Sequence, residues 1–275
     1  MPELPEVETV RLGLEPFVAG RVIASVWIGR GDLRRAVPEG FGQSVAGRRV
    51  AALERRGKLM IWQLDDGGAV LIHLGMSGRV GVSAGEPAAE RHDHLRFRLD
   101  SGDVVTFHDP RRFGFVDYAA PGRLAEDPLL ARLGPEPLSP GFDGAVLAAA
   151  FRGRAQPVKL ALLDQTVVAG LGNIYVSESL YRAGISPFAA AGSLGPRRLA
   201  RLASAIRAVL TEAVAAGGST LKDHRRPDGG LGYFQMRFQV YERGGEACAS
   251  GKSGHFIKRV VQGGRSTYYC PICQR

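Results

Sequence analysis

The order of secondary-structure signals along the chain is the feature that most constrains its fold. Between residues 21 and 118, short runs of branched and aromatic residues alternate with turn residues such as the DDGG of 65–68. Strands at this regular spacing are typical of an antiparallel sandwich. The runs predict strands at 22–28, 44–54, 58–64, 69–74, 95–99, 104–108 and 114–118, and residues 83–91, rich in Ala, Pro, Gly and Glu, predict a loop.

Helical patterning precedes and follows these strands. Residues 5–17 carry apolar positions at helical spacing, and Pro5 suits the first position of a helix. Five prolines between 121 and 140 mark a boundary, after which helices are expected from Pro157, at 174–183 and at about 196–216. The prediction is an α+β fold, with a two-layer antiparallel β-sandwich in residues 1–120, a helical domain in 121–235 and a β-hairpin in 236–275.

Positive charge is concentrated near the carboxyl terminus. The 275-residue chain has a formal net charge of +9, and residues 219–275 hold ten Lys or Arg against four Asp or Glu. Charge gathered in one region favours a polyanionic partner. Nucleic acid is favoured over a membrane, because no long apolar span or basic amphipathic helix occurs. The alternative is a charge excess that only keeps the protein soluble.

The amino terminus carries a possible nucleophile. Met1 precedes a small residue and we expect its removal, which would leave Pro2 as a secondary amine beside the Glu3 carboxyl group. An α-amine has a pKa of about 7.7–8.0 against about 10.4 for lysine, so more of it is uncharged at neutral pH. Such an amine can attack a carbon electrophile while the neighbouring acid donates a proton. The alternative is that Pro2 only follows the start and Glu3 only caps a helix.

The cysteines indicate a reduced compartment. All three lie at or beyond Cys248, and two of them form the sequence CPIC that ends at Cys273. An odd count is not typical of a secreted disulfide framework, so the pattern favours a metal knuckle or inert thiols. The acidic amino terminus also lacks the basic and apolar regions of a signal peptide, which predicts a cytoplasmic protein.

Six separated segments, taken together, are similar to one known family. They are MPELPEVET at 1–9, HLGMSG at 73–78, DPRRFG at 109–114, LDQ at 163–165 with GLGNIY at 170–175, GSTLKD at 218–223 and GRSTYYCPICQ at 264–274. In order and spacing the chain resembles formamidopyrimidine-DNA glycosylase, a bacterial family that repairs 8-oxoguanine. The resemblance covers essentially the whole chain and implies a helix–two-turns–helix motif and a zinc-finger-type hairpin.

The resemblance implies a bifunctional enzyme that acts as a monomer on damaged double-stranded DNA. It would remove oxidised purines through an imine on Pro2, with Glu3 as acid and base, and cleave the abasic strand by β,δ-elimination. Lys58 matches the lysine that assists β-elimination, and Arg265 matches the arginine that binds phosphate and acts in δ-elimination. Without the family context, Lys58 would be an ordinary exposed strand lysine.

Further residues match DNA-contacting positions of the family. Extruding a base costs free energy, and apolar or guanidinium side chains can fill the vacated space. The matches are the wedge residues Met76, Arg111 and Phe113, the phosphate contacts His73, Lys159 and Asn173, and the additional contacts His92 and Arg154. The alternatives are core packing for the apolar residues, a surface ion pair for Arg111 and simple solvation for the others. Residues 217–235 resemble the lid over the extruded base.

The chain departs from the family at the zinc hairpin, which normally uses four cysteines. The expected second cysteine falls at Ser253, and a serine hydroxyl is a poor zinc ligand. His255 could instead complete a zinc site with Cys248, Cys270 and Cys273. The alternatives are a hairpin without zinc and a water molecule as fourth ligand.

Two rival functions are compatible with parts of the sequence. One is an endonuclease VIII-like glycosylase for oxidised pyrimidines, against which Leu4 and the long 217–235 segment argue. The other is a DNA-binding protein without chemistry, which reads duplex shape through phosphates.

Overall fold

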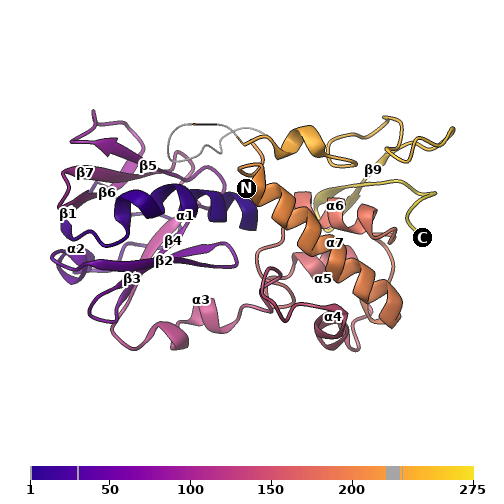
Figure 1. Cartoon of the computed structure of the whole chain (residues 1–275), viewed down its shortest axis with the longest axis horizontal. Helices are drawn as coiled ribbons and strands as arrows, with labels where there is room; N and C mark the ends of the chain where they lie inside the picture. Colours follow the sequence, from indigo (N-terminus) through magenta and orange to yellow (C-terminus); the bar gives the residue numbers. More distant parts are fainter. Residues whose placement is uncertain (1, 30, 221–229, 231) are drawn as a thin grey trace. The chain divides into compact units, whose positions relative to one another are not determined.

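The computed structural model describes residues 2–29, 31–220, 230 and 232–275. The chain divides into two compact units (Figure 1). The first contains Met1–Ala131 and Ala216–Tyr233, and the second contains Arg132–Ala215 and Phe234–Arg275. Among the residues described, no helix combines the length and the apolar character needed to cross a bilayer. The division into three functional domains stays a prediction, since compact units reflect contacts rather than function.

Two four-stranded antiparallel sheets build most of the first unit. Their strand orders are β1-β6-β7-β5 and β2-β3-β4-β8. The strands are β1 (Ile23–Ile28), β2 (Val50–Arg56), β3 (Leu59–Leu64), β4 (Ala69–His73), β5 (Arg79–Ala84), β6 (Asp93–Leu99), β7 (Asp103–His108) and β8 (Phe115–Ala119). The helices of this unit are α1 (Leu4–Val18), α2 (Phe41–Val45), α3 (Pro128–Ala131) and a 3₁₀ turn at Leu124–Glu126.

The two sheets share one hydrophobic core. Met60, Trp62 and Leu64 are alternate residues of β3 and all face this core, as the two-residue period of a strand requires. The ring of Trp62 lies 5.0 Å from that of Phe97 in β6, centroid to centroid, so the contact joins the sheets. The apolar face of α1 packs into the same cluster. The predicted α+β fold with an antiparallel sandwich is confirmed.

Two strand predictions differ from the structure. Residues 44–49 belong to the end of α2 and a turn, and β2 begins only at Val50. β5 has no counterpart among the predicted strands, because its sequence RVGVSA contains glycine and serine and so lacks a clear apolar alternation. β5 forms because its whole length pairs with β7, a long-range contact that a local pattern does not report.

The start of α1 is tied to a distant segment. One oxygen of the buried Glu6 carboxylate accepts a hydrogen bond from the Glu3 backbone N–H at 2.9 Å. The other oxygen accepts from the N–H and hydroxyl of Ser219 at 2.8 and 3.0 Å. Glu6 therefore holds the residues just before the helix and the 216–220 segment in one arrangement.

Helices and a hairpin build the second unit. They are α4 (Gly144–Phe151), α5 (Val158–Leu163), α6 (Asn173–Arg182), α7 (Pro196–Ala215), 3₁₀ turns at Ala191–Ser193 and Phe234–Arg237, and the strands β9 (Lys258–Gln262) and β10 (Arg265–Tyr269). α6 and α7 match the predicted helices to within one residue, and α5 begins one residue after Pro157 but is short and ends at Leu163. The missed helix α4, GAVLAAAF, is apolar throughout and lacks an amphipathic period; its start is capped by the Asp143 carboxylate.

A buried carboxylate fixes the segment that leads to the hairpin. Glu178 of α6 is fully buried and accepts hydrogen bonds from the backbone N–H groups of Gln239, Val240 and Tyr241 at 2.9, 3.0 and 2.8 Å. Burial raises the pKa of Glu178, although the three N–H groups and Arg182 oppose this. The chain entering the hairpin is thereby anchored to α6.

Candidate active site and nucleic-acid interface

Pro2 and Glu3 lie immediately before α1. Glu3 is the N-cap residue and is only 3% exposed, and Pro2 is also buried. The first turn of a helix carries unpaired N–H groups and a partial positive charge, which favour a carboxylate at this position. The helix start thus gives Glu3 a defined place beside the candidate nucleophile. The expected removal of Met1 lies outside the described residues.

Lys58 and His73 lie at one end of the β2-β3-β4 sheet. Lys58 occupies the tight turn between β2 and β3 and is 8% exposed. The next residue, Leu59, pairs with His73 in the register of β3 and β4. Burial and then the charge of Lys58, followed by those of Arg34 and Arg35, lower the pKa of His73 to about 4.

The hydrogen bonding of His73 fixes its tautomer. Its Nδ1 accepts from the Gly75 N–H at 3.0 Å, and its ring stacks on Phe115 with centroids 5.2 Å apart. A neutral ring that accepts at Nδ1 carries its proton on Nε2. His73 can therefore offer an uncharged N–H donor to an anion at neutral pH.

We expect His73 to make the stability of the fold depend on pH. Its folded-state pKa of about 4 lies below the ordinary 6.5, so the unfolded chain binds more protons between these values. The stabilisation is complete above pH 6.5 and declines as the pH falls toward 4, by about 3 kcal/mol in total. Urea unfolding of wild type and His73→Gln across this interval measures the effect. Equal pH slopes for the two proteins would contradict the prediction.

The three wedge candidates share one surface of the first unit. Met76 and Phe113 are 38% and 42% exposed, so neither side chain is part of the hydrophobic core. The Arg111 guanidinium carbon lies 4.7 Å from the centroid of the Phe113 ring, a cation–π arrangement. The core-packing alternative for Met76 and Phe113 does not hold in this structure.

His92 and Arg154 have local partners. The ring of His92 meets that of His108 edge to face, with centroids 5.9 Å apart. Arg154 donates to the Ala150 carbonyl at 2.9 Å and lies 3.9 Å from the Asp164 carboxylate. His92 belongs to the first unit and Arg154 to the second. Their roles in DNA binding stay predictions.

Lys159 and Asn173 hold the strand that carries Arg265. Lys159 is 0% exposed, and its Nζ donates to the Ser266 carbonyl at 2.9 Å and the Thr267 hydroxyl at 2.6 Å. Asn173, which begins α6 one residue before the predicted helix start, donates from Nδ2 to the same carbonyl at 3.0 Å. Burial and the nearby Arg265 lower the pKa of Lys159 to about 8. A direct phosphate contact by Lys159 would require it to leave these partners.

Ser266 and Thr267 are functional-site residues that were not among the predicted ones. Their one signal in the sequence is their place directly after Arg265 in the segment GRSTYYCPICQ. The predicted lid at 217–235 lies largely outside the described residues, which omit 221–229 and 231.

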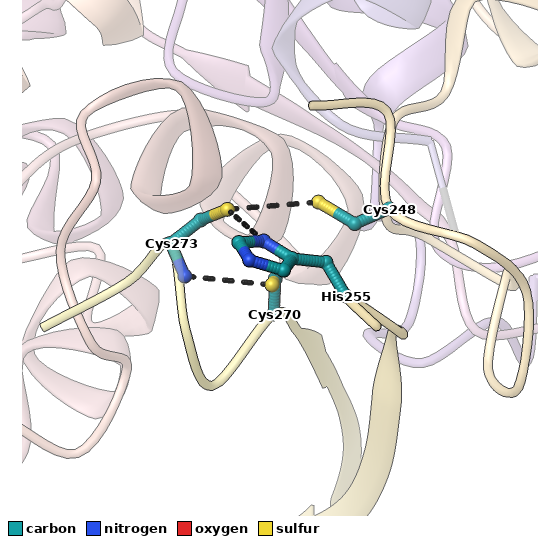
Figure 2. A group of neighbouring side chains, drawn as sticks. All are labelled: Cys248, His255, Cys270 and Cys273. Atoms are coloured by element: carbon teal, nitrogen blue, oxygen red, sulfur yellow. Dashed lines mark hydrogen bonds between the residues drawn. The ribbon is translucent and has the colours of Figure 1, made fainter. Parts of the chain in front are cut away.

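The three cysteines and His255 converge at the base of the hairpin. Figure 2 shows their side chains pointing toward one another. The His255 Nδ1 lies 3.3 Å from the Cys273 sulfur, which lies 3.8 Å from the Cys248 sulfur. One ligand atom from each of the four residues lies within 4.8 Å of the others. Three thiols and one imidazole are a donor set that zinc accepts in structural sites, so the residues fit a zinc ion.

Cys248 is prepared for ionisation by its neighbours. Burial opposes the thiolate, but hydrogen bonds from Ser250, Tyr181 and Cys270 lower the pKa of Cys248 to about 7. The Tyr181 hydroxyl of α6 lies 3.0 Å from the Cys248 sulfur. Zinc binds thiolates, so a lowered pKa reduces the cost of releasing the proton.

Comparisons with known proteins cover the whole chain. Family models match for the formamidopyrimidine-DNA glycosylase N-terminal domain over residues 1–116, the formamidopyrimidine-DNA glycosylase H2TH domain over 133–225, and the zinc finger found in FPG and IleRS over 254–275. The chain is 54% identical over 283 residues to formamidopyrimidine-DNA glycosylase of Paracoccus denitrificans and 49% identical over 286 residues to that of Caulobacter vibrioides, with 100% of each chain covered.

Solved structures agree with these matches. The MutM (FPG) protein from Thermus thermophilus is 42% identical, with a TM-score of 0.87 over 99% of this chain and 98% of that chain. The Lactococcus lactis Fpg, in complex with DNA containing an abasic site, is 32% identical, with a TM-score of 0.89 over 99% of each chain. Together with the sandwich, the helix that begins at Asn173 and the cysteine and histidine cluster, these matches show that the chain belongs to the formamidopyrimidine-DNA glycosylase family.

Proposed function

We propose that this protein is a base-excision repair enzyme that removes oxidised purines, 8-oxoguanine and formamidopyrimidines, from duplex DNA and cleaves the abasic strand. Family membership over the full chain is the observation that carries the proposal. A solved relative is a complex with DNA containing an abasic site. The net charge of +9 suits a polyanionic substrate.

The reaction would begin at the amino terminus. After loss of Met1, the Pro2 nitrogen would bond to C1′ of the damaged nucleotide while the N-glycosidic bond breaks. Glu3 would donate its proton to the departing base, take up the proton that the attacking amine loses, and pass it to the ring oxygen as the sugar ring opens, which leaves an iminium on Pro2. The iminium withdraws electrons, so the 3′ and then the 5′ phosphate leave by β- and δ-elimination. Lys58 would assist the first elimination and Arg265 the second.

The remaining predicted residues would bind and open the duplex. Met76, Arg111 and Phe113 would fill the space left by the extruded base, which their exposure supports. His73 would donate its Nε2 proton to a phosphate, and His92, Arg154 and Asn173 would make further contacts. For Lys159 we propose a positioning role, because its ammonium group is already bonded to the strand of Arg265.

Zinc would have a structural role in this enzyme. When bound by Cys248, His255, Cys270 and Cys273, it would hold the hairpin that carries Arg265. We further expect a monomeric, cytoplasmic protein with functional domains at 1–120, 121–235 and 236–275.

Borohydride trapping tests the proposed chemistry. Reduction during reaction with an 8-oxoguanine duplex should join enzyme and DNA covalently, and mass spectrometry should locate the bond at Pro2. Pro2→Gly should slow or abolish capture, because glycine offers only a primary amine with different geometry. Absence of capture by the wild type would overturn the proposed function and favour a DNA-binding protein without chemistry.

The pyrimidine-specific alternative needs its own comparison. Excision of 8-oxoguanine opposite cytosine should exceed excision of thymine glycol by this protein. The reverse preference would favour an endonuclease VIII-like glycosylase for oxidised pyrimidines.

A further inference from the structure

One fully buried carboxylate joins the two turns that carry the wedge. Asp109 is 0% exposed. Its Oδ1 accepts from the Ser77 hydroxyl at 2.5 Å and from the Arg111 N–H at 3.3 Å, and its Oδ2 accepts from the Gly114 N–H at 2.8 Å. The Ser77 hydroxyl also accepts from the Arg111 N–H at 3.2 Å.

The partners of Asp109 coincide with the wedge along the chain. Ser77 follows Met76, Gly114 follows Phe113, and Arg111 is itself a wedge residue. The carboxylate therefore bonds to the residue after Met76, to the residue after Phe113 and to the backbone of Arg111 itself. Hydrogen bonds to a buried charged acceptor are among the stronger ones in proteins.

The backbone around Asp109 is also constrained. A Cβ atom at Gly75 would lie 2.3 Å from the Gly114 nitrogen, so the two turns touch backbone to backbone. Arg112 adopts a φ of 56°, a left-handed conformation that is unfavourable for a side chain of this size. The Arg112 N–H donates to the Asp109 carbonyl at 3.2 Å, which closes this turn.

Asp109 also reaches the neighbouring strand. Its backbone N–H donates to the His92 carbonyl at 3.0 Å, and its carbonyl lies 2.8 Å from the Nε2 of His94. The backbone of a further predicted DNA contact, His92, is thus fixed by the same residue. No part of Asp109 is exposed, so its effect on a substrate has to pass through these neighbours.

We propose that Asp109, with Ser77, is a positioning residue that sets the wedge in the geometry needed to replace an extruded base. The proposal rests on the proposed function. Extruding a base costs free energy that inserted side chains offset, whereas chemistry on an already accessible sugar does not carry this cost. Loss of the carboxylate should therefore impair excision from duplex DNA and spare the lyase reaction on an abasic site in a single strand.

Asp109→Asn is the direct test, because it keeps the shape and removes one acceptor. An amide nitrogen facing the Gly114 N–H would set two donors against each other. Single-turnover release of 8-oxoguanine from a duplex should fall by about 10- to 100-fold, the range for a misplaced positioning group. Strand cleavage of a single-stranded oligonucleotide with a preformed abasic site should stay within about twofold of wild type.

Ser77→Ala provides a milder variant if Asp109→Asn does not fold, as judged by its thermal unfolding. It should show the same selective loss, smaller in size. The controls lie elsewhere in the first unit: Ser83→Ala removes a hydroxyl that donates to the Gly85 carbonyl, and Asp66→Asn changes a carboxylate that accepts from the Gly68 N–H. Both variants should leave the two reactions unchanged. Unchanged duplex excision, or an equal fall of both reactions, in the folded variant would overturn the proposal. A wild type inactive in both assays would instead overturn the proposed function.

Discussion

Glu3→Gln is expected to lower the rate of base release from an 8-oxoguanine duplex by about 10²- to 10⁴-fold, the usual contribution of general acid–base catalysis. Glutamine has nearly the same shape and retains an acceptor oxygen, so the start of α1 should persist. It cannot donate a carboxyl proton to the departing base. The loss therefore falls on the chemical step, and single-turnover release under saturating enzyme measures it.

The control for this experiment uses a substrate from which the base has already gone. Borohydride capture on a preformed abasic site should continue with Glu3→Gln, although more slowly, because the nucleophile at Pro2 is unchanged. Glu39→Gln, at an exposed position, should behave as wild type in both assays. Release of 8-oxoguanine by Glu3→Gln at the wild-type rate would remove Glu3 from the mechanism.

Loss of a zinc ligand is expected to have the second large effect. Structural zinc binds peptides of this type with about 10–16 kcal/mol, so the hairpin should depend on its metal. Cys270 is fully buried in a cluster with Val240 and Ile257, and Cys270→Ala should remove both a ligand and part of this small core. We expect bound zinc to fall from one per chain to background, measured by elemental analysis after gel filtration.

Variants at His255 identify the fourth ligand. His255→Ala should weaken zinc retention against a chelator, whereas His255→Cys should preserve it, because cysteine restores a four-thiolate site. Cobalt substitution gives a readout independent of activity, since the thiolate-to-metal absorption should strengthen in His255→Cys. Ser253→Ala is the matched control on the same loop. If His255→Ala retained zinc as well as wild type, His255 would not be a ligand.

The sequence predicted elements whose signal is local. The runs of β3, β4 and β7 alternate or are continuously apolar, and α7 shows clear helical spacing, so these elements appear where expected. β5 and α4 were missed because one lacks alternation and the other lacks a polar face. Their formation depends on neighbours that lie far away in the chain.

In the candidate site, too, local features could be predicted and long-range contacts could not. The motifs identified Pro2, Glu3 and the wedge residues, because residue type and order carry those signals. They could not reveal that Lys159 is buried against Thr267, since the two are 108 residues apart. Nor could they indicate that the Asp109 carboxylate accepts from Ser77, because that serine lies 32 residues away and becomes a neighbour only when two turns meet.

The Glu178 carboxylate limits which residues position 178 can accept. It receives three main-chain donors, and glutamine could satisfy at most two of them with its single oxygen while facing its amide toward the third. Aspartate would be one methylene too short to reach. The segment 239–241 can vary in its side chains, since only its peptide groups are used, but position 178 has to remain glutamate in any descendant that keeps this junction.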